Sequence, residues 1–483
     1  MRRTIRMLLI PALLAAVLPV AGAVVAHSKK VSCPSVAPKP LKFGKPTYID
    51  ETRAGGEPVS IVAQDGSIIV SAHAGTTHIY KDPNAAGGAG DFVVGYSNQT
   101  LNWRSADGGK TWKYTGVAGQ EAGPHSPSSS GFSDPDLAID AGGKLYNTEI
   151  NLANDAVYSS PDDGQSWPVA NPGAASGDRP WLTGQEAEEV YLYVNSPHQL
   201  WRSTDGGVTF LLVTTDFPAV SKLQNDPLNF DHGLIGPTAD GGVAISEDDG
   251  VSWDSYPNPG LGKSTQFFGA IAVDRAGWVY SAAAGGYTGA GDTKPDGEVT
   301  FNYFNRVTRK WGTSAVKIPM PKGDAMWPWI IAGDNGRVSV VWYQTLGKDA
   351  NKFYIFAAQT TNAHGSKVKC SDGKKHAIAP QWTVTNASKR PIHVGDICLA
   401  GTGCNANTDF SRGDRRLGDF FTVNYDHKGN LFIASGDTML QSPLDGPKPV
   451  SNPIFIKQVS GTKMLKKPDK IRETRCLFPQ PTC

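Results

Sequence analysis

Apart from its first 26 residues, this 483-residue chain has no apolar run long enough to cross a membrane, and neither sign of charge is in excess. Its 46 Lys and Arg stand against 45 Asp and Glu, and omitting the three N-terminal arginines leaves 43 against 45. A near-neutral balance gives no basic surface for nucleic acid. We therefore expect no nucleic-acid partner and no membrane span in the mature protein.

Cysteine is scarce, and its spacing disfavours a metal centre. The chain has six cysteines: Cys33, Cys370, Cys398, Cys404, Cys476 and Cys483. None forms a Cys-x2-Cys pair and no histidine spacing supports zinc, so disulfide pairing in an oxidising compartment is the better interpretation. Cys398 and Cys404 bracket a short Gly-containing loop that lets their Cα atoms approach within disulfide range, which predicts a local bridge.

The first 26 residues have the features of a secretory signal peptide. Three arginines precede an apolar run that is interrupted by two prolines and ends in small residues. We expect cleavage after Ala23 or Ala26 and a secreted, extracellular protein. A membrane anchor is the alternative, which the prolines and the small-residue exit disfavour. Residues 27–45 are rich in Pro and Lys and predict a linker or a poorly ordered lead-in.

The chain is rich in turn formers, with 54 Gly and 34 Pro, and no stretch has a sustained helical period, so it is predicted to be all-β. The pattern Ser-x-Asp-x-Gly-x-Ser/Thr-aromatic occurs four times, at residues 105–112, 160–167, 203–210 and 246–253. We call these segments the repeat turns. In each we expect a tight hairpin in which the Asp accepts backbone N–H groups, the Gly takes a positive φ and the ring packs beneath. The structural carboxylates would be Asp107, Asp162, Asp205 and Asp248.

The repeat turns resemble the Asp boxes of sialidase and BNR-repeat β-propellers, where the box lies on the outer rim between the last two strands of a blade. A second repeat, offset from these turns, combines an acidic residue that is often followed by Pro, a short apolar run, and Asp-x-x-Gly or a close variant. Its copies recur about every 60 residues, roughly the size of a propeller repeat with long loops. We therefore predict one β-propeller domain of four-stranded blades over residues 46–483, with seven blades favoured and six the alternative.

The innermost strand of each propeller blade starts at the mouth of the central channel, so the residues that open each copy should converge there. These are Glu57, Asp134, Asp136, Asp178, Arg179, Asp231, His232, Trp327, Trp329, Arg416 and Asp419. Converging carboxylates raise one another's pKa, and a pair flanking a sugar is what glycoside hydrolysis requires. The catalytic candidates are Glu57, Asp134, Asp178 and Asp419. Two alternatives stay open: the carboxylates cap strand-opening turns, or they bind calcium through hard oxygen ligands.

The resemblance implies a substrate carboxylate held by three arginines, the first at the opening of the first inner strand, and a Tyr–Glu nucleophile with an Asp acid/base. Here Glu57 stands where that first arginine is expected, and no Tyr–Glu pair can be assigned. Arg53, Arg179 and Arg416 could supply the arginines. The remaining substrate-binding candidates are His232, Trp327 and Trp329, since an exposed ring at a channel mouth offers a stacking surface for a sugar.

Two functions remain open from sequence. The first is a secreted, sialidase-like propeller that binds a glycan or glycoprotein at the channel mouth, with or without hydrolysing it. The second is a non-catalytic propeller that serves as an interaction scaffold or cell-surface binder, which the missing arginine motif favours. Neither requires a cofactor, although bound calcium is an option, and we expect a monomer. Fold alone does not choose between them.

Overall fold

The structure is a computed structural model, and it describes residues 31–73, 79–80, 91–92, 100–116, 133–151, 154–347, 349–401, 415–442, 446–447 and 451–471. The predicted signal peptide lies outside these residues. The chain forms two compact units, one containing residues 31–34 and 367–376 and the other containing the rest of the described chain. No helix in the described part is long and apolar enough to cross a membrane.

The smaller unit is held by a disulfide between Cys33 and Cys370. Beside it, β29 (Ser366–Lys369) and β30 (Lys375–Ile378) form a two-stranded sheet, and the Ser371 N–H donates to the Ser32 carbonyl over 2.8 Å. Cys398 is also disulfide-bonded and buried. Cys404 lies outside the described residues, so the local Cys398–Cys404 bridge stays a prediction.

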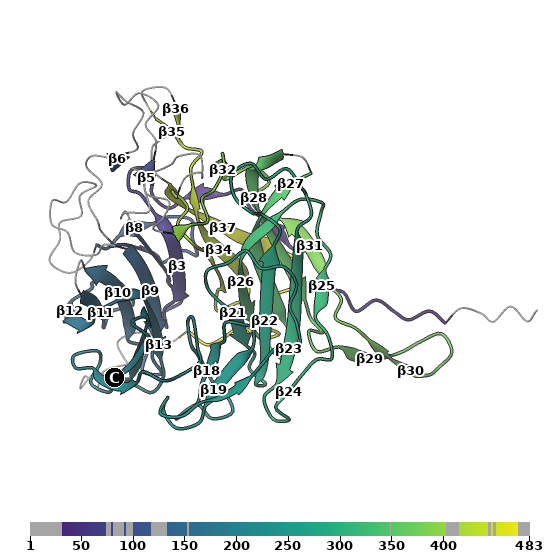
Figure 1. Cartoon of the computed structure of the whole chain (residues 1–483), viewed down its shortest axis with the longest axis horizontal. Coiled ribbons are helices and arrows are strands. Elements are labelled where there is room, and N and C mark those ends of the chain that lie inside the picture. The colour runs from purple at the N-terminus through teal and green to yellow at the C-terminus, as the bar shows by residue number, and fades with distance from the viewer. Residues whose placement is uncertain are drawn as a thin grey trace, which may run out of the picture. The chain divides into compact units, whose positions relative to one another are not determined.

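The larger unit is a ring of seven β-sheets, which confirms the predicted all-β propeller with seven blades (Figure 1). Each blade below is given from its inner to its outer strand. Blade 1 has β3 (Gly56–Val62), β4 (Ile68–His73), β7 (Thr100–Ser105) and β8 (Lys113–Tyr114). Blade 2 has β9 (Ser133–Ile139), β10 (Leu145–Asn151), β11 (Asn154–Ser160) and β12 (Val169–Ala175). Blade 3 has β13 (Asp178–Gly184), β14 (Val190–Ser196), β15 (Gln199–Ser203) and β16 (Leu211–Thr214).

The second half of the ring repeats this plan with two additions. Blade 4 has β17 (Gln224–Asn225), β18 (Leu234–Pro237), β19 (Val243–Ser246) and β20 (Asp254–Tyr256). Blade 5 has β21 (Ala270–Val273), β22 (Trp278–Gly285), β23 (Glu298–Asn305) and β24 (Lys310–Trp311), with β25 (Val316–Ile318) also on β23. Blade 6 has β26 (Ala325–Ala332), β27 (Val338–Leu346), β28 (Asp349–Thr360) and β31 (Thr383–Asn386), with β32 (His393–Val394) also on β28.

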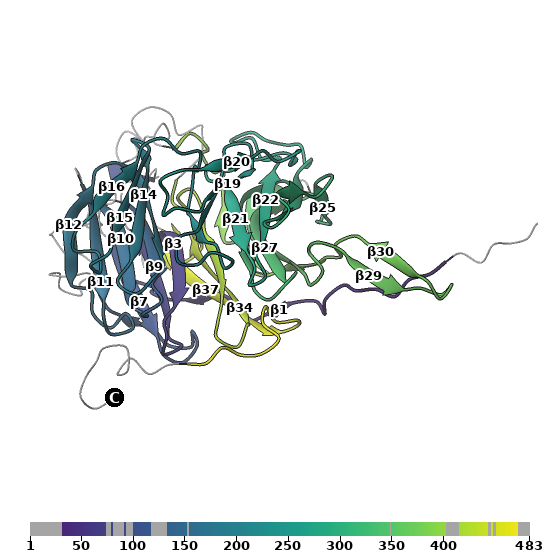
Figure 2. The same cartoon turned by 90° about the horizontal axis from the view of Figure 1, so that it is seen from below.

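Blade 7 closes the ring with strands from both ends of the larger unit. It has β33 (Thr422–Tyr425), β34 (Leu431–Asp437), β37 (Asn452–Ser460) and β1 (Lys42–Phe43), and β2 (Thr47–Tyr48) also pairs with β37. Figure 2 shows β3 beside β34 and β37. Within residues 27–45, predicted to be a linker or a poorly ordered lead-in, Lys42–Phe43 pairs with β37. The physical reason is the free edge of β37, whose backbone groups β1 and β2 satisfy.

Contacts between successive inner strands define the channel. They run from β3 through β9, β13, β17, β21, β26 and β33 and return to β3. Neighbouring blades cover both faces of a blade, and all six residues of β4, the second strand of blade 1, are buried. The apolar clusters join adjacent blades: Ile68 and Val70 of blade 1 pack with Phe432 and Phe455 of blade 7.

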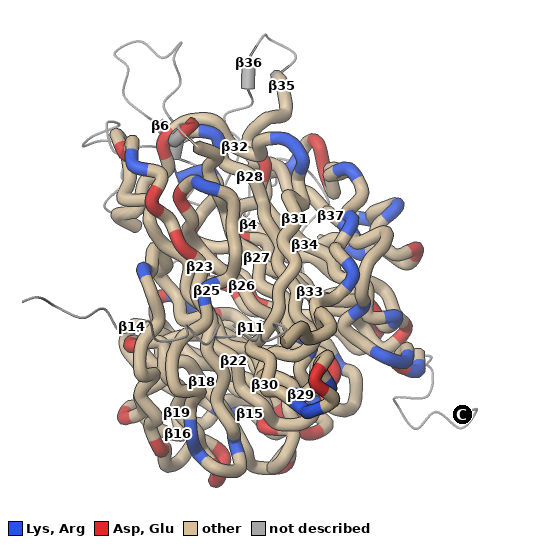
Figure 3. Tube along the Cα trace, turned by 90° about the vertical axis from the view of Figure 1, so that its right-hand side faces the viewer, with Lys and Arg blue, Asp and Glu red and all other residues tan. Residues whose placement is uncertain are grey.

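Two minor hairpins complete the described strands. In these, β5 (Ile79–Tyr80) pairs with β6 (Asp91–Phe92), and β35 (Gln441–Ser442) pairs with β36 (Gly446–Pro447). Along the trace, Lys and Arg are interspersed with Asp and Glu, in keeping with the near-neutral charge of the sequence (Figure 3).

All four repeat turns connect the third and fourth strands of their blades, in blades 1 to 4. They share one hydrogen-bond pattern. In the first, the Asp107 Oδ1 accepts the N–H groups of Lys110 and Thr111, both at 3.0 Å. In every copy the Ser or Thr hydroxyl donates to the second carboxylate oxygen over 2.6 Å. The shared hydrogen bonds stabilise the turn itself. The ring of Trp112, at the end of the first turn, packs against Phe455 of blade 7 with ring centroids 5.2 Å apart.

Candidate functional site

Four inner strands begin with the same unusual backbone. Glu57, Asp134, Arg179 and Trp327 each directly precede a proline and adopt positive φ angles of 49°, 59°, 60° and 49°. This left-handed conformation costs a non-glycine residue of order 1 kcal/mol or more. The strand register skips at these positions in blades 1, 2 and 6, as in a β-bulge. A bulge changes the direction of a side chain and leaves its residue unpaired. The repeated X-Pro opening therefore removes each of these residues from the backbone pairing with the neighbouring strand.

Blades 1 and 2 thereby bring two carboxylates together. Glu57 is 1 % exposed, and its Oε1 accepts the Asp419 backbone N–H over 2.9 Å. Burial and the charge of Asp419 raise the pKa of Glu57. The hydrogen bond with Asp134 acts in the opposite direction, but burial is the largest effect. Burial and the Glu57 charge raise the pKa of Asp134 to about 7. Asp178 is exposed as a residue, but neighbouring atoms partly shield its carboxyl group from water. This loss of hydration and the charge of Asp134 raise the pKa of Asp178 to about 6.

A histidine at the end of β4 completes this group. The His73 Nε2 lies 3.5 Å from the Glu57 Oε2, and both residues are buried. One ligand atom from each of Glu57, His73 and Asp134 lies within 4.8 Å of the other two. Burial lowers the pKa of His73 to about 4, so its imidazole is neutral. Among the described residues, Glu57, His73 and Asp134 form a group of potential ligands that lie close enough together to hold a metal ion.

Arg179 lies next to the carboxylates and stacks on aromatic rings. Its Cζ is 3.8 Å from the Trp181 ring centroid and 4.2 Å from that of Phe420. The residue is 2 % exposed, and within the described chain none of its three guanidinium nitrogens has a hydrogen-bond partner. Its positive charge acts on Glu57, Asp134 and Asp178. A guanidinium held by ring faces keeps its in-plane donors available for a planar anion.

Two further charged pairs surround the group. Arg415 and Asp419 form a bidentate ion pair, so these two charges compensate each other. The Asp136 Oδ2 accepts from the Leu182 N–H over 2.8 Å and from Lys222 Nζ over 2.6 Å, which ties blade 2 to blade 3. Asp136, a predicted mouth residue, is thus engaged in a structural contact.

A fifth carboxylate, Asp155 on β11, is fully buried, and neither of its oxygens has a hydrogen-bond partner among the described residues. Burial, with the charges of Asp134 and Asp178, raises its pKa to about 8. We refer to Glu57, His73, Asp134, Asp178 and Arg179 as the mouth cluster. Asp155 lies close enough to this cluster for the charges of Asp134 and Asp178 to act on its carboxyl group.

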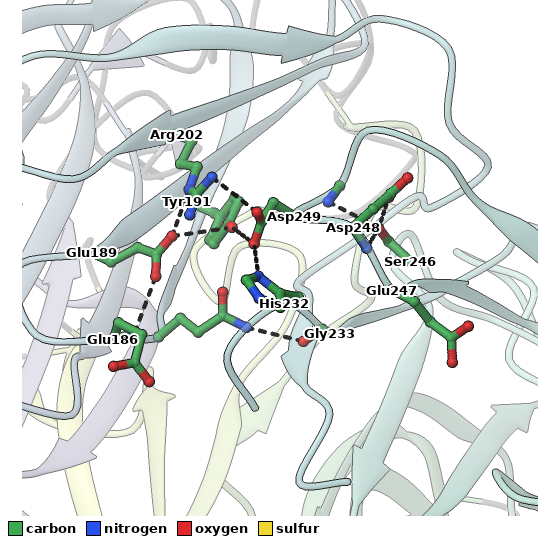
Figure 4. A network of polar contacts seen from close by, with 12 residues as sticks. Glu186, Glu189, Tyr191, Arg202, His232, Gly233, Ser246, Glu247, Asp248 and Asp249 are labelled. Atoms are coloured by element: carbon green, nitrogen blue, oxygen red, sulfur yellow. Dashed lines mark hydrogen bonds and ion pairs between the residues drawn. The ribbon is translucent and has the colours of Figure 1, made fainter. Parts of the chain in front are cut away.

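Not every predicted mouth residue joins this cluster. His232 is 59 % exposed and contacts Asp249 of the fourth repeat turn over 3.1 Å. Asp249 also pairs with Arg202, which donates to Glu189, and Tyr191 donates to the same Glu189 oxygen (Figure 4). This network joins blades 3 and 4. Asp231 and His232 lie between β17 and β18, where the seventh copy of the strand repeat is compressed, and so do not open an inner strand. A role of His232 in substrate binding stays a prediction.

The two predicted tryptophans differ in their environment and in their exposure to solvent. Trp327 is 2 % exposed, packed against Phe267 and Tyr343, and so offers no exposed ring. Trp329 is half-buried and stacks on Trp181 with ring centroids 6.0 Å apart, beside the Arg179 site.

Arg53 pairs with Asp50 over 2.8 Å and stacks on Tyr114 at 4.1 Å, so it is engaged within blade 1. Arg416 is buried, and the charge of its neighbour Arg415 acts on Glu57.

Two cavities lie outside the mouth cluster. The larger of the two, of about 590 Å³, is lined by Lys263 and its neighbours before β21 and by Thr288, Asp292 and other residues after β22. The second, of about 330 Å³, is lined in part by Phe267 and by Phe268, whose ring packs edge-on against Trp181 at 5.2 Å. The second cavity therefore borders the aromatic group that holds Arg179.

Sequence reasoning missed His73, Asp155 and Arg415. His73 lies directly opposite Gly56 in the ladder, so a strand-register alignment of the first blade would have paired it with the predicted carboxylate. Asp155 is a lone acidic residue in an otherwise buried strand, which is a recognisable signal. No sequence signal separates Arg415 from Arg416.

Comparison with known proteins gives partial likeness. No family model matches the chain. A xyloglucanase of Hypocrea jecorina (strain QM6a) is 27 % identical over 156 residues, 30 % of this chain and 17 % of that protein. A xyloglucanase of a Paenibacillus species is 27 % identical over 166 residues, 32 % of this chain and 15 % of that protein. The chain thus spans about a sixth of the length of these curated relatives.

Among solved structures, similarity is confined to the fold. The GH74 xyloglucanase of Xanthomonas campestris has a TM-score of 0.43 and 12 % identity, covering 84 % of this chain and 55 % of its own. The NanB sialidase of Streptococcus pneumoniae has a TM-score of 0.40 and 12 % identity, covering 63 % of this chain and 67 % of its own.

Proposed function

We propose that this protein is a secreted propeller that binds a carboxylate-bearing glycan at the mouth cluster and hydrolyses it. The observation that carries the proposal is Arg179, a buried guanidinium stacked on Trp181 and Phe420 with no hydrogen-bond partner in the described chain. Leaving such donors unsatisfied is costly, and a carboxylate accepting two parallel N–H bonds satisfies them. The acidic group of the ligand would therefore insert beside the rings.

A glycan is the ligand class that the surroundings favour. Aromatic faces bind the apolar faces of sugars, and Trp329 and Phe268 extend the aromatic surface from Trp181. Two partial relatives of this chain are xyloglucanases. Secretion follows from the predicted signal peptide and agrees with the disulfide between Cys33 and Cys370, since such bonds persist in oxidising compartments.

Hydrolysis is proposed because carboxylates adjoin the anion site. Asp178 directly precedes Arg179 and is exposed, whereas Asp134 beside it is buried. Two carboxylates near one glycosidic bond supply the acid and the base or nucleophile of glycoside hydrolysis. We infer that Asp178, the exposed residue whose pKa is raised to about 6, is the proton donor, and that Asp134 is the base or nucleophile. Glu57 and Asp419 hold the strand openings together through their own hydrogen bond.

The test compares acidic with neutral glycans on purified mature protein. Binding of sialosides and uronides is measured by calorimetry beside the matched neutral glycosides, and fluorogenic substrates report hydrolysis. We expect acidic ligands to bind at least tenfold more tightly, and Arg179→Lys to remove that preference because Lys lacks the planar fork. Arg309→Lys is the control, since Arg309 also lies over a ring, that of Tyr256, and pairs with Glu247.

Hydrolysis and binding separate in a second variant. Asp178→Asn should lower turnover by roughly 100-fold or more while binding is retained. Equal affinity for neutral and acidic glycans, unchanged in Arg179→Lys, would overturn the anion site. Acid-selective binding without any turnover in wild-type protein would instead support the alternative, a non-catalytic glycan-binding scaffold.

A further inference from the structure

We propose that Glu57, His73 and Asp134 form a binding site for a divalent transition-metal ion of the zinc class. The three side chains come from β3, β4 and β9, in two adjacent blades. One ligand atom of each lies within 4.8 Å of the other two, and all three residues are buried. An imidazole nitrogen with two carboxylate oxygens is a donor set typical of zinc and manganese, whereas calcium takes six to eight oxygens.

The separation of His73 and Glu57 suits a shared ion better than a direct bond. The His73 Nε2 and the Glu57 Oε2 are 3.5 Å apart, which exceeds the usual 2.7 to 3.2 Å of an N–H···O hydrogen bond. Zinc bonds of about 2.0 to 2.2 Å place neighbouring ligands of a tetrahedral site roughly 3.3 to 3.6 Å apart. The two atoms therefore already stand at the edge length of a zinc tetrahedron.

A second observation, independent of the acidic cluster itself, is the state of the Glu57 Oε2. This atom belongs to a residue that is 1 % exposed, and it has no hydrogen-bond partner in the described chain. The other oxygen of the same carboxylate is held by the Asp419 N–H at 2.9 Å. One oxygen is thus fixed in place while the other points at His73 and remains available, which is the arrangement of an oriented metal ligand.

Charge gives a third reason. Glu57 and Asp134 are both buried, and their carboxylate oxygens lie within 4.8 Å of each other. Buried charge is unfavourable unless it is paired or coordinates a metal. A divalent ion held between these two carboxylates would compensate their charge where they are closest.

The backbone holds the ligands in position before any ion binds. Glu57 and Asp134 both have positive φ angles before a proline, and this bulge fixes the direction of each side chain. His73 is set by the strand ladder, opposite Gly56. Sites built on such rigid elements bind without large rearrangement. Three protein ligands would leave a fourth position open, as in zinc sites that accept water or substrate.

The metal site stands on these contacts and does not depend on the proposed glycan function. If both hold, the ion supplies countercharge beside Arg179, so that a ligand carboxylate meets less repulsion from Asp134 and Asp178.

The experiment uses the purified mature protein, stripped with EDTA and dialysed into metal-free buffer. Zn²⁺, Mn²⁺ and Ca²⁺ are added separately, bound metal is counted by mass spectrometry, and affinities are measured by calorimetry without glycan. We expect about one Zn²⁺ per chain, bound at least tenfold more tightly than Ca²⁺. Glu57→Gln and His73→Gln should each weaken Zn²⁺ binding at least tenfold. His393→Gln is the matched control, because His393 is equally buried but contacts Thr438 over 2.9 Å.

Should either variant fail to fold, X-ray absorption at the zinc edge of the wild-type protein replaces it, and a first shell with one imidazole and oxygen donors is expected. Substoichiometric Zn²⁺ in wild-type protein, tighter binding of Ca²⁺ than of Zn²⁺, or unchanged affinity in folded His73→Gln would each overturn the site. Because these readouts contain no glycan, their failure is distinct from failure of the proposed function.

Discussion

Arg179 lies against the indole of Trp181, with its Cζ 3.8 Å from the ring centroid, although only one proline separates the two residues in the chain. In a regular strand, residues two apart point to the same face, but 6 to 7 Å apart along the strand. The positive φ of Arg179 shortens that path and folds the guanidinium back over the ring. The strained strand opening is therefore what creates the proposed anion site.

The ring of Phe420 should matter for both stability and ligand binding. Its centroid is 4.2 Å from the Arg179 Cζ, and it packs on Trp181, Phe268 and Trp329. We expect Phe420→Leu to lower the free energy of unfolding by about 1 to 2 kcal/mol, through lost contact and an incompletely filled site. It should also weaken binding of acidic glycans several-fold. Denaturant unfolding and calorimetry measure the two effects.

Phe421→Leu is the matched control for that variant. Phe421 is fully buried and stacks on Tyr343 at 4.1 Å. A similar loss of stability with unchanged glycan affinity is expected. Equal weakening of binding in both variants would show that the rings act only through general packing.

A substitution in the first repeat turn should lower stability without affecting glycan binding at the mouth cluster. Asp107 accepts hydrogen bonds from Ser105, Lys110 and Thr111, and although desolvation opposes ionisation, these bonds hold the pKa of Asp107 well below its ordinary value. Asp107→Ala should lower the free energy of unfolding by about 1 kcal/mol, the usual scale for such bonds in an exposed turn. Lys110→Ala, which keeps the backbone donor, should be neutral. Loss of glycan binding in Asp107→Ala at full stability would contradict a structural role.

Glu149 should make the protein less stable as the pH rises. Burial raises the pKa of Glu149 to about 7 from an ordinary 4.5, and its Oε1 accepts the Tyr158 hydroxyl over 2.5 Å. The folded state therefore binds more protons than the unfolded state between these two values, so stability falls as pH increases from about 4.5 to about 7. Glu149→Gln mimics the protonated acid and should be more stable at pH 8 by up to about 3 kcal/mol.

Thermal unfolding of wild type and Glu149→Gln at pH 4, 6 and 8 measures this effect as a difference. Other buried carboxylates follow the same trend, so the difference between the two proteins isolates Glu149. Glu186→Gln, at an exposed position, is the control. A wild-type advantage at pH 8 would refute the predicted sign.

Disulfide connectivity is testable by peptide mapping without reduction. We expect the Cys33–Cys370 bond seen in the structure and, as a prediction from loop length, a bond between Cys398 and Cys404. A peptide joining Cys398 to Cys476 would exclude the local bridge.

Local chemistry made part of the fold readable from sequence. The repeat turns are encoded by residues within eight positions of each other, because one carboxylate satisfies the N–H groups of its own turn. The strand openings were found for the same reason, since Glu57-Pro58 and Asp134-Pro135 are short, recognisable phrases. Their regular recurrence led to seven blades, and the structure confirms that number.

Tertiary structure decided the composition of the mouth cluster. His73 joins Glu57 through strand pairing, Asp155 reaches the cluster from the third strand of blade 2, and the charge of Arg415 acts on Glu57. His232, which sequence placed among the mouth residues, pairs with Asp249 instead.

The division has a physical reason. A turn is set by hydrogen bonds between neighbours in the chain, so eight residues of this sequence were enough to determine each repeat turn. The facing of side chains across a channel depends on register, bulges and the packing of blades whose residues are as far apart as Glu57 and Asp419, 362 positions. One shifted residue turns a side chain to the opposite face of its strand, and only the closed ring of blades determines which residues meet.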